Sequence, residues 1–300
     1  MSKRILEKCR KYYVNFHCHT LKSDGFCTTE ELIERTITQN EDATVIMAVT
    51  DHNKLSDELP QLQKKYEGQI ILLSGCEVST TYVVPGTERK IEVHIIALDY
   101  KPDSKELKEM LKKNRHDKRG YVEAILAKLE NIGIHVVDNY EELVEFAKPS
   151  THVGRMTLAR MMVNKNMVSN VDEAFDLYFG SYGARTCYVD NHFEFVSIEE
   201  CVSTIKKSGG IPILCHPYFY GLSETEMLEL ITHFKNSGGL AMETFYAFYS
   251  EEQRAALRQI CHSMGLKESA GSDYHGNPHE RLDYHFPSYV YEELMNLDRG

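Results

Sequence analysis

The stretch Tyr13-Val14-Asn15-Phe16-His17-Cys18-His19-Thr20 sets the pattern on which the fold depends. Its first four residues are mostly apolar and include aromatic and β-branched side chains, which predicts a buried strand. His17 and His19 follow directly, and in extended backbone two residues at i and i+2 point to the same side. Both imidazoles can therefore face one metal ion. An isolated pair of this kind is explained at least as well by two surface histidines at a strand end, so the rest of the chain must decide.

Short apolar runs like the first recur along the chain. They lie at residues 44–49, 70–73, 91–98, 211–214, 240–245 and, more weakly, 267–270. Helical patterns separate most of them, as at 30–39, where Thr28 and Glu31 form a capping-box start. Strands that alternate with helices indicate parallel strands joined by crossover helices, so we predict an α/β barrel.

Two stretches depart from this alternation. The runs at 70–80 and 90–98 are joined by Val84-Pro85-Gly86-Thr87-Glu88, which is typical of a hairpin turn. The stretch from about residue 103 to residue 190 has a helical apolar pattern and no convincing strand. We therefore expect the first part of the barrel at 12–105, a helical insertion or cap at 106–189, and the second part of the barrel at 190–300.

The composition narrows the class of protein. The 300 residues carry a formal net charge of −11, which argues against a surface that holds duplex DNA by neutralising its phosphates, although a local basic pocket is still allowed. Small anionic substrates that meet bound cations fit better. Because no apolar run reaches the length of a membrane span and the first residues lack the apolar core of a signal peptide, we expect a cytoplasmic protein without membrane contact. The 8 cysteines are scattered without a C-x-x-C pair, so free buried thiols are expected.

Histidine and carboxylate residues follow strand after strand. Taken singly, each has an ordinary explanation: His94 fits a hydrogen-bonded core histidine, and His52 fits a surface loop. Their repetition favours a common site, because the C-terminal ends of parallel barrel strands converge on one face. Glu77 would also be too costly to bury unpaired, and a metal would supply the missing charge. The candidate ligands are His17, His19, Asp24, His52, Glu77, His94, His216, Asp273 and His275.

The residue types in this set indicate the chemistry. Imidazole mixed with carboxylate, without a thiolate pair, favours Zn²⁺, Mn²⁺ or Fe²⁺ over a structural zinc. Two such ions about 3.5–4 Å apart can bridge a hydroxide and stabilise both the attacking and the leaving oxygen of an in-line displacement. Hydrolysis of phosphate esters is the reaction class that most often needs this. We expect a metal-bound hydroxide as the nucleophile and Glu77 as the carboxylate that bridges two ions; the sequence singles out no general acid.

At these motifs the chain resembles the PHP family, named for polymerase and histidinol phosphatase. The matching runs are Phe16-His17-Cys18-His19-Thr20, Ser23-Asp24-Gly25, Thr50-Asp51-His52, Gly75-Cys76-Glu77, Val93-His94, His216-Pro217 and Ser272-Asp273-Tyr274-His275-Gly276. The resemblance implies a distorted seven-stranded β/α barrel with a trinuclear metal centre. It also implies a grouping of the ligands: His17, His19, Glu77 and Asp273 for one ion; Glu77, His94 and His216 for a second; Asp24, His52 and His275 for a third.

Within that family the chain is most similar to the phosphoesterases that act on nucleoside 3′,5′-bisphosphates and short single-stranded oligonucleotides. That branch carries a helical insertion, and its motif resembles the run His152-Val153-Gly154-Arg155-Met156-Thr157-Leu158-Ala159-Arg160, followed by Glu173-Ala174-Phe175. Arg155 is then a candidate phosphate clamp, because a guanidinium can grip two phosphate oxygens at once. Arg185 is a second, weaker candidate. For each arginine the alternative is a solvated charge.

Two departures from the family pattern concern the surroundings of the ligands and the substrate pocket. Asn15 stands where the family usually has Asp, so an amide replaces a carboxylate near the ligands, and metal affinity is expected to be lower. Met156-Thr157 replaces the Pro-His that usually follows the insertion arginine, and this puts the fine shape of the pocket in doubt.

Three other functions stay open at this point. A histidinol-phosphate phosphatase shares the metal set but should not need a clamp for a second phosphate. A metal-dependent amidohydrolase also begins its barrel with His-x-His, although the late Asp273-x-His275 pair and Glu77 in place of a modified lysine argue against it. A non-catalytic metal-binding regulatory module would be indicated by missing ligands, and none is missing.

Overall fold

The computed structural model describes residues 11–114, 118–148, 150, 153–179, 187–189, 195–277 and 280–299. The contacts between residues divide the chain into two units. A sheet unit holds the residues up to Thr20 together with Gly25–Asn114 and Phe195–Gly300, and a helical unit holds Leu21–Asp24 and Arg115–Glu194.

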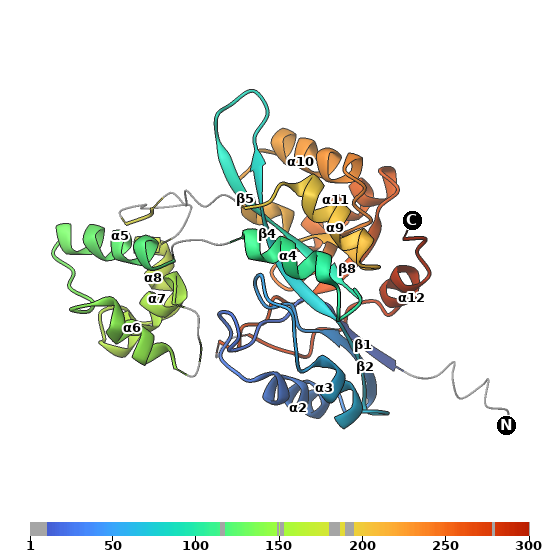
Figure 1. Ribbon diagram of the computed structural model, residues 1–300, viewed down its shortest axis with the longest axis horizontal. Helices are drawn as coiled ribbons and strands as arrows, with labels where there is room; N and C mark the ends of the chain where they lie inside the picture. The colour runs from blue at the N-terminus through green and yellow to red at the C-terminus, as the bar shows by residue number, and fades with distance from the viewer. Residues whose placement is uncertain are drawn as a thin grey trace. The chain divides into compact units, whose positions relative to one another are not determined.

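The first sheet of the sheet unit is parallel and has the order β1-β2-β3. Its strands are β1 (Lys11–Asn15), β2 (Ala43–Ala48) and β3 (Ile70–Leu73), and the crossover helices between them are α2 (Thr29–Gln39) and α3 (Leu59–Lys65) (Figure 1). The helices pack their apolar sides against the strands, because Leu32 and Leu62 belong to the same buried cluster as Tyr13 and Met47. The predicted capping box of Thr28 and Glu31 is confirmed at the start of α2.

The second sheet has the order β4-β5-β6-β7-β8. Its strands are β4 (Gly75–Val83), β5 (Lys90–Leu98), β6 (Ile211–Leu214), β7 (Ala241–Tyr246) and β8 (Lys267–Gly271) (Figure 1). The neighbours β4, β5 and β6 run antiparallel, whereas β6, β7 and β8 run parallel. Only the parallel strands are joined by crossover helices, namely α10 (Glu224–Asn236) and α11 (Glu251–Ser263). The unit also holds α4 (Lys105–Lys113), α9 (Ile198–Lys207), the 3₁₀ turn η2 (Pro217–Tyr220) and α12 (Tyr289–Met295).

Backbone hydrogen bonds between strand ends join the two sheets. The N–H of Asp273, beyond β8, donates to the carbonyl of His17, beyond β1, at 2.9 Å. On the other side, the N–H of Glu77 on β4 donates to the carbonyl of Thr50, beyond β2, at 3.2 Å. Among the described residues neither sheet closes on itself. The mixed α/β fold is therefore confirmed, whereas the closed seven-stranded barrel is not, since the strands form sheets of three and five.

The predicted hairpin is confirmed as the antiparallel pair β4 and β5, with Glu77 opposite Ile96. The structure separates β3 from β4 at Ser74, where the sequence shows one continuous run. The hydroxyl of Ser74 donates to the carbonyl of Tyr100 at 2.6 Å, and the Ser74 carbonyl accepts from the N–H of Asp99 at 2.7 Å. These bonds hold the chain where it leaves one sheet for the other.

The helical unit consists of short helices around a core of its own. These helices are α5 (Lys118–Asn131), α6 (Tyr140–Ala147), α7 (Arg155–Asn164) and α8 (Val171–Ala174), and a π-helical turn η1 (Phe175–Phe179) follows α8 directly. Val122, Leu143, Leu158 and Phe179 are buried in that core. The predicted helical character of this stretch is confirmed for its described residues.

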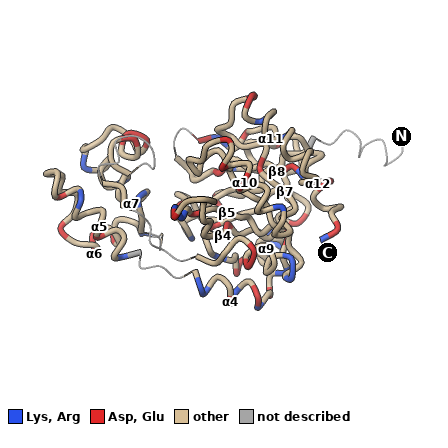
Figure 2. Tube along the Cα trace, turned by 90° about the horizontal axis from the view of Figure 1, so that it is seen from above, with Lys and Arg blue, Asp and Glu red and all other residues tan. Residues whose placement is uncertain are grey.

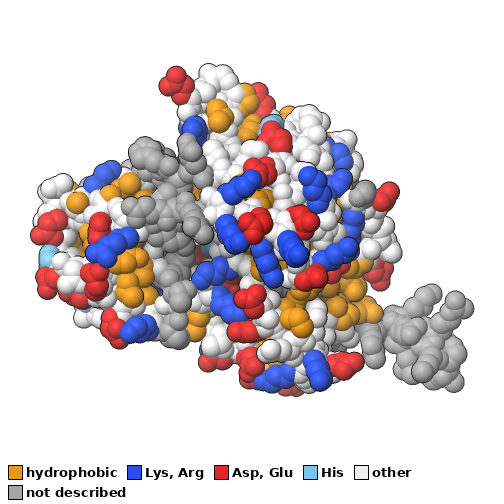
Figure 3. Space-filling view, viewed as in Figure 1, with side chains coloured by type: hydrophobic (Ala, Val, Ile, Leu, Met, Phe, Trp, Pro, Cys, Tyr) orange, Lys and Arg blue, Asp and Glu red, His pale blue; other side chains and the backbone are white. Residues whose placement is uncertain are grey.

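Charged side chains are spread over the helices and loops of the described residues, and the strands between them are mostly uncharged (Figure 2). On the face drawn in Figure 3, basic and acidic side chains are interspersed. Within the described residues no helix is long and apolar enough to cross a membrane.

Candidate metal centre

His17 and His19 follow β1 directly, and both side chains are fully buried. The chain is held on both sides at this point. The carbonyl of His17 accepts from the N–H of Asp273, and the N–H and hydroxyl of Thr20 donate to the Asp51 carboxylate at 2.8 and 2.7 Å. Asp51 thus fixes the chain near the histidines rather than facing them.

The histidines gather around the buried carboxylate of Glu77 on β4. Its Oε1 lies 2.8 Å from Nδ1 of His94 and 3.1 Å from Nε2 of His216. Its Oε2 lies at 3.3, 3.2 and 3.1 Å, respectively, from Nε2 of His17, Nε2 of His19 and Nδ1 of His52. The two oxygens of one carboxylate therefore face two different groups of imidazoles, which is the arrangement that a bridging carboxylate needs.

Asp273 completes the group around the first two histidines. Its Oδ1 lies 3.3 Å from Nε2 of His17 and 3.0 Å from Nε2 of His19. Its Oδ2 accepts a hydrogen bond of 2.7 Å from the hydroxyl of Tyr246. Asp273 and His216 both have positive φ angles, +54° and +25°, which are costly for residues other than glycine. Backbone strain at two candidate ligands is typical of a functional site.

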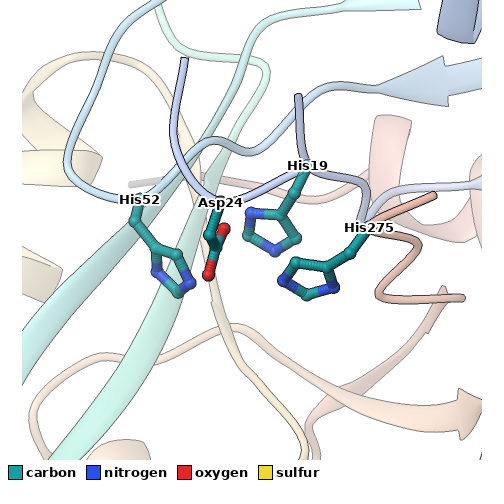
Figure 4. A group of neighbouring side chains, drawn as sticks. All are labelled: His19, Asp24, His52 and His275. Carbon is teal, nitrogen blue, oxygen red and sulfur yellow. The ribbon is translucent and has the colours of Figure 1, made fainter. Parts of the chain in front are cut away.

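A further group consists of His19, Asp24, His52 and His275 (Figure 4). Each can offer one ligand atom, and these atoms lie within 4.8 Å of one another. The ring of His19 stacks on His275 and on His52, with centroids 4.3 and 4.6 Å apart. Figure 4 shows the four side chains projecting from their loops to the same side. The group contains all three residues that the family resemblance implies for a third ion.

Two more carboxylates orient the histidines. Oε1 of Glu243, on β7, lies 2.8 Å from Nδ1 of His17, while its Oε2 accepts from the N–H of His216 at 2.8 Å. Glu92, two residues before His94 on β5, lies 3.2 Å from Nε2 of that ring. None of Glu243, Glu92 and Tyr246 was predicted from the sequence to belong to the site. Glu92 could have been found, because positions i and i+2 on a strand share a face.

The close packing of charged groups shifts their pKa values. Burial alone would lower the pKa of His17, but the carboxylates of Glu243, Asp273 and Glu77 raise it well above its ordinary value. Burial would raise the pKa of Glu77, yet the surrounding imidazoles, His52 foremost, hold it well below its ordinary value. The cluster thus carries buried carboxylates whose charge requires positive charge nearby.

The hydrogen-bond pattern fits divalent metal ions. Nε2 of His17 and Nδ1 of His94 are buried, make no hydrogen bond and face carboxylate oxygens. The other nitrogen of each ring lies beside Glu243 or Glu92, which favours the tautomer with its proton there. Each of these nitrogens and the carboxylate oxygen opposite it therefore need a positive charge between them, which is a proton at the raised pKa of the histidine or a bound metal ion. The nitrogen and oxygen donors suit Zn²⁺, Mn²⁺ or Fe²⁺.

Asn15 lies behind the ligands and holds backbone in place. Its amide NH₂ donates to the hydroxyls of Tyr13 and Ser272 at 3.0 and 2.7 Å, and its Oδ1 accepts from the N–H groups of His17 and Ser272 at 3.3 and 3.0 Å. Both functions of the amide are used, and a carboxylate could not make the two donated bonds. Asn15 therefore ties the end of β1 to the end of β8.

The predicted phosphate clamps belong to the helical unit. Arg155 is the first residue of α7; its guanidinium donates to the carbonyl of Phe179 at 3.2 Å and lies over the ring of Phe175 at 5.9 Å. Its role as a clamp stays a prediction. Arg185 lies outside the described residues, as does His152 of the insertion motif.

The fold and the geometry together describe an α/β protein with a buried centre of imidazoles and carboxylates suited to several divalent ions. No model of a known protein family matches the chain. Among curated proteins, the chain is 29% identical to a 5′-3′ exoribonuclease of Haemophilus influenzae, with 89% of this chain and 90% of the relative covered. It is 26% identical to a 3′,5′-nucleoside bisphosphate phosphatase of Chromobacterium violaceum, with 87% of each covered.

Two solved structures share the fold of the chain. An amidohydrolase from Chromobacterium violaceum, solved with bound sulfate and no metal, superposes with a TM-score of 0.80 at 25% identity and covers 94% of this chain and 96% of its own. A Bifidobacterium adolescentis protein assigned as a metal-dependent phosphoesterase superposes with a TM-score of 0.75 at 20% identity, with 96% of each chain covered, and supports the fold alone. The resemblance is confirmed at the level of homology: the chain is a homologue of proteins named as a 5′-3′ exoribonuclease and as a 3′,5′-nucleoside bisphosphate phosphatase.

Proposed function

We propose that the chain is a metal-dependent phosphoesterase that hydrolyses a phosphate ester of a small nucleotide-like substrate. The substrate would be a nucleoside 3′,5′-bisphosphate or a short single-stranded oligonucleotide. The observation that carries the proposal is the carboxylate of Glu77, whose two oxygens face separate groups of buried imidazoles. The names of the curated relatives support the substrate class, since one acts on RNA from its 5′ end and another on nucleoside bisphosphates.

The proposed ligands would hold two or three ions. His17, His19, Glu77 and Asp273 would hold the first, Glu77, His94 and His216 the second, and Asp24, His52 and His275 the third. When bound, Zn²⁺, Mn²⁺ or Fe²⁺ would activate water near neutral pH and offset the charge of the phosphate.

Residues of the chain would prepare these ligands for that task. Glu243 and Glu92 orient the rings of His17 and His94, so that with ions bound each would present an unprotonated nitrogen on the side of Glu77. The hydroxyl of Tyr246 occupies Oδ2 of Asp273 and leaves Oδ1 facing the histidines. Since His17 and His19 are fully buried, bulk water is kept from this part of the centre.

The helical unit, proposed as the insertion at 106–189, would serve substrate choice. Arg155 and Arg185 would grip a phosphate of the substrate other than the one that is hydrolysed. A second phosphate separates this function from that of a histidinol-phosphate phosphatase, which has no such group to hold. Amide hydrolysis is the other function to be tested, because the solved structure of similar fold from Chromobacterium violaceum is described as an amidohydrolase.

A substrate panel tests the proposal. Purified protein, with its metal content measured, would be given a nucleoside 3′,5′-bisphosphate, a short 5′-phosphorylated oligoribonucleotide, duplex DNA, histidinol phosphate and a set of N-acyl amino acids. We expect hydrolysis of the first two, with kcat/KM for the bisphosphate at least ten times that for histidinol phosphate. The control variant is Glu268→Gln, which changes a buried carboxylate that is paired with Arg258 and is not a proposed ligand. Asp51→Asn would be unsuitable, because Asp51 holds Thr20 beside the centre. Preference for histidinol phosphate, or amide cleavage without phosphate release, would overturn the proposal.

A further inference from the structure

Aromatic side chains gather beside the candidate metal centre, around His216. Phe219 lies on the 3₁₀ turn η2 directly after that histidine, and Phe248 lies just beyond β7. Both are large apolar side chains with about half of their surface exposed, 52% and 49%. Two buried tyrosines, Tyr246 and Tyr249, lie against them.

Ring contacts connect these side chains to one another and to the centre. The ring centroid of Phe219 lies 5.3 Å from that of Tyr246 and 6.1 Å from that of Tyr249. The rings of Phe219 and Tyr249 are stacked. Phe248 lies 5.7 Å from Tyr246. His216 in turn lies 6.3 Å from Phe219 and 5.9 Å from Tyr246. Phe219 therefore contacts His216 directly, and His216 faces the carboxylate of Glu77.

Hydrogen bonds hold this surface in place. Tyr220, the neighbour of Phe219, donates its hydroxyl to the carbonyl of Cys215 at 2.9 Å and accepts from the N–H of His94 at 2.9 Å. Beneath Phe248, the hydroxyl of Tyr246 is bonded to Asp273. The loops that carry the exposed rings are therefore anchored to the same residues that form the centre, and little ordering is required when a ligand binds.

We propose that Phe219 and Phe248 form a stacking surface for a base of the substrate, and this inference rests on the proposed function. A phosphate at the metal centre would bring the attached nucleoside within reach of rings that adjoin His216. Planar bases stack on aromatic side chains with little regard to sequence, because every base has a π-face. A substrate that consists of phosphate and sugar alone gains nothing from these rings, so they would select nucleotides from among small phosphate esters.

Binding can be measured without turnover, because the chain contains 0 tryptophans. Phe219→Trp and Phe248→Trp each introduce the single tryptophan of the chain at the proposed surface, and Leu228→Trp introduces one at an exposed position on α10, outside the aromatic group. In the metal-loaded protein we expect a non-hydrolysable adenosine 5′-phosphonate to quench the first two saturably and the matching ribose 5-phosphonate to leave them unchanged. Equal quenching in Leu228→Trp, or no quenching in either phenylalanine variant, would overturn the proposal.

Kinetics give a second, independent readout. In Phe219→Ala the ratio of kcat/KM for a nucleoside 3′,5′-bisphosphate to kcat/KM for ribose 5-phosphate should fall about 10-fold, mostly through KM, and Phe219→Tyr should restore it. Leu228→Ala should keep the wild-type ratio. An unchanged ratio in Phe219→Ala contradicts the stacking role. If the wild type releases phosphate from neither compound while quenching persists, the proposed phosphoesterase function fails and the stacking surface stands.

Discussion

The carboxylate of Glu77 is the residue on which the centre depends most. In Glu77→Gln the side chain keeps its shape but loses the negative charge that would offset two cations. We expect kcat to fall by at least about 100-fold, as for the loss of a key electrostatic group, and bound metal per chain to fall in parallel. Steady-state kinetics and elemental analysis of the same sample would measure both. A near-normal kcat with full metal content would show that Glu77 is no bridge.

Glu243 acts on the centre through other residues, so its removal should give a milder defect. Glu243→Gln keeps one acceptor but loses the charge beside His17 and weakens the bond from the N–H of His216. Such partners of ligating histidines typically contribute 10–100-fold to metal affinity, and we expect a loss of that size. Competition with a chelator of known affinity would measure it. In Glu268→Gln, a buried carboxylate paired with Arg258, the metal affinity should stay unchanged while stability falls; equal affinities in the two variants would contradict the positioning role.

At this scale the sequence predicted the identity of the candidate ligands better than their support. His17, Glu77 and Asp273 could be found because each stands at or just after a strand. Glu243 and Tyr246 become meaningful only when β7 lies beside the ends of β1 and β8. Their partners lie far away in the sequence, so no local spacing of residues predicts these contacts.

Helix α2 illustrates how a sequence motif sets an element. The hydroxyl of Thr28 accepts from the N–H of Glu31 at 3.2 Å, and the Glu31 carboxylate accepts from the N–H of Thr28 at 2.8 Å. Thr28→Ala should lower the free energy of unfolding by about 1 kcal/mol, measured by denaturant titration at neutral pH. Thr38→Ala, an exposed threonine on the same helix, should be neutral or slightly stabilising.

The effect of this cap should depend on pH. Bonds from the backbone and hydroxyl of Thr28 lower the pKa of Glu31 in the folded chain. The stability they contribute is therefore fully present above the ordinary pKa of a glutamate and is lost as the pH falls through the lowered folded value. The difference between wild type and Thr28→Ala should shrink in acid; a difference that grows there would refute this account.

Helix α7 begins at Arg155, so the clamp prediction belongs to this element. Arg155→Ala should raise KM for a nucleoside 3′,5′-bisphosphate by roughly 10-fold and change kcat little, because uniform binding affects KM. A small monophosphate should be affected much less. The matched control is Arg119→Ala on α5, an exposed arginine paired with Glu123 and Glu141. Because Arg155 also donates to the carbonyl of Phe179, Tm should be measured alongside; a lower Tm with an unchanged KM would assign it a structural role only.

At the scale of whole elements, apolar runs predicted the strands well, but they did not predict where one strand ends and the next begins. All seven predicted strands are present, and the two ends of each lie within two residues of their predicted positions. The break at Ser74 was missed, because the apolar pattern runs through it and the bonds that turn the chain come from Asp99 and Tyr100. The two sheets are likewise joined by a few bonds between distant strand ends, which periodicity cannot reveal.

The molecule as a whole should depend on its ions for both activity and stability. Prolonged chelation should abolish phosphate release, and Mn²⁺, Zn²⁺ or Fe²⁺ should restore it. A ligand at 1,000 times its Kd stabilises the folded state by about 4 kcal/mol, so the chelated protein should also melt at a lower temperature. Calorimetry before and after reloading would measure the shift. Undiminished turnover in a demonstrably metal-free sample would refute the proposed mechanism.

The bond between Asn15 and Ser272 joins residues 257 positions apart, and it has a consequence for the order of events during synthesis. At about 5–20 residues per second, a ribosome needs roughly 10–50 s to make the chain between them. Until β8 emerges, the segment after β1 lacks its backbone partners Ala270, Asp273 and Tyr274, although its bonds to Thr50 and Asp51 can already form. Glu77 is synthesised much earlier, but an ion bound in that interval would lack the Asp273 carboxylate and would exchange more readily. The ion that the folded protein keeps would therefore be selected only after Asp273 has joined the group around His17 and His19.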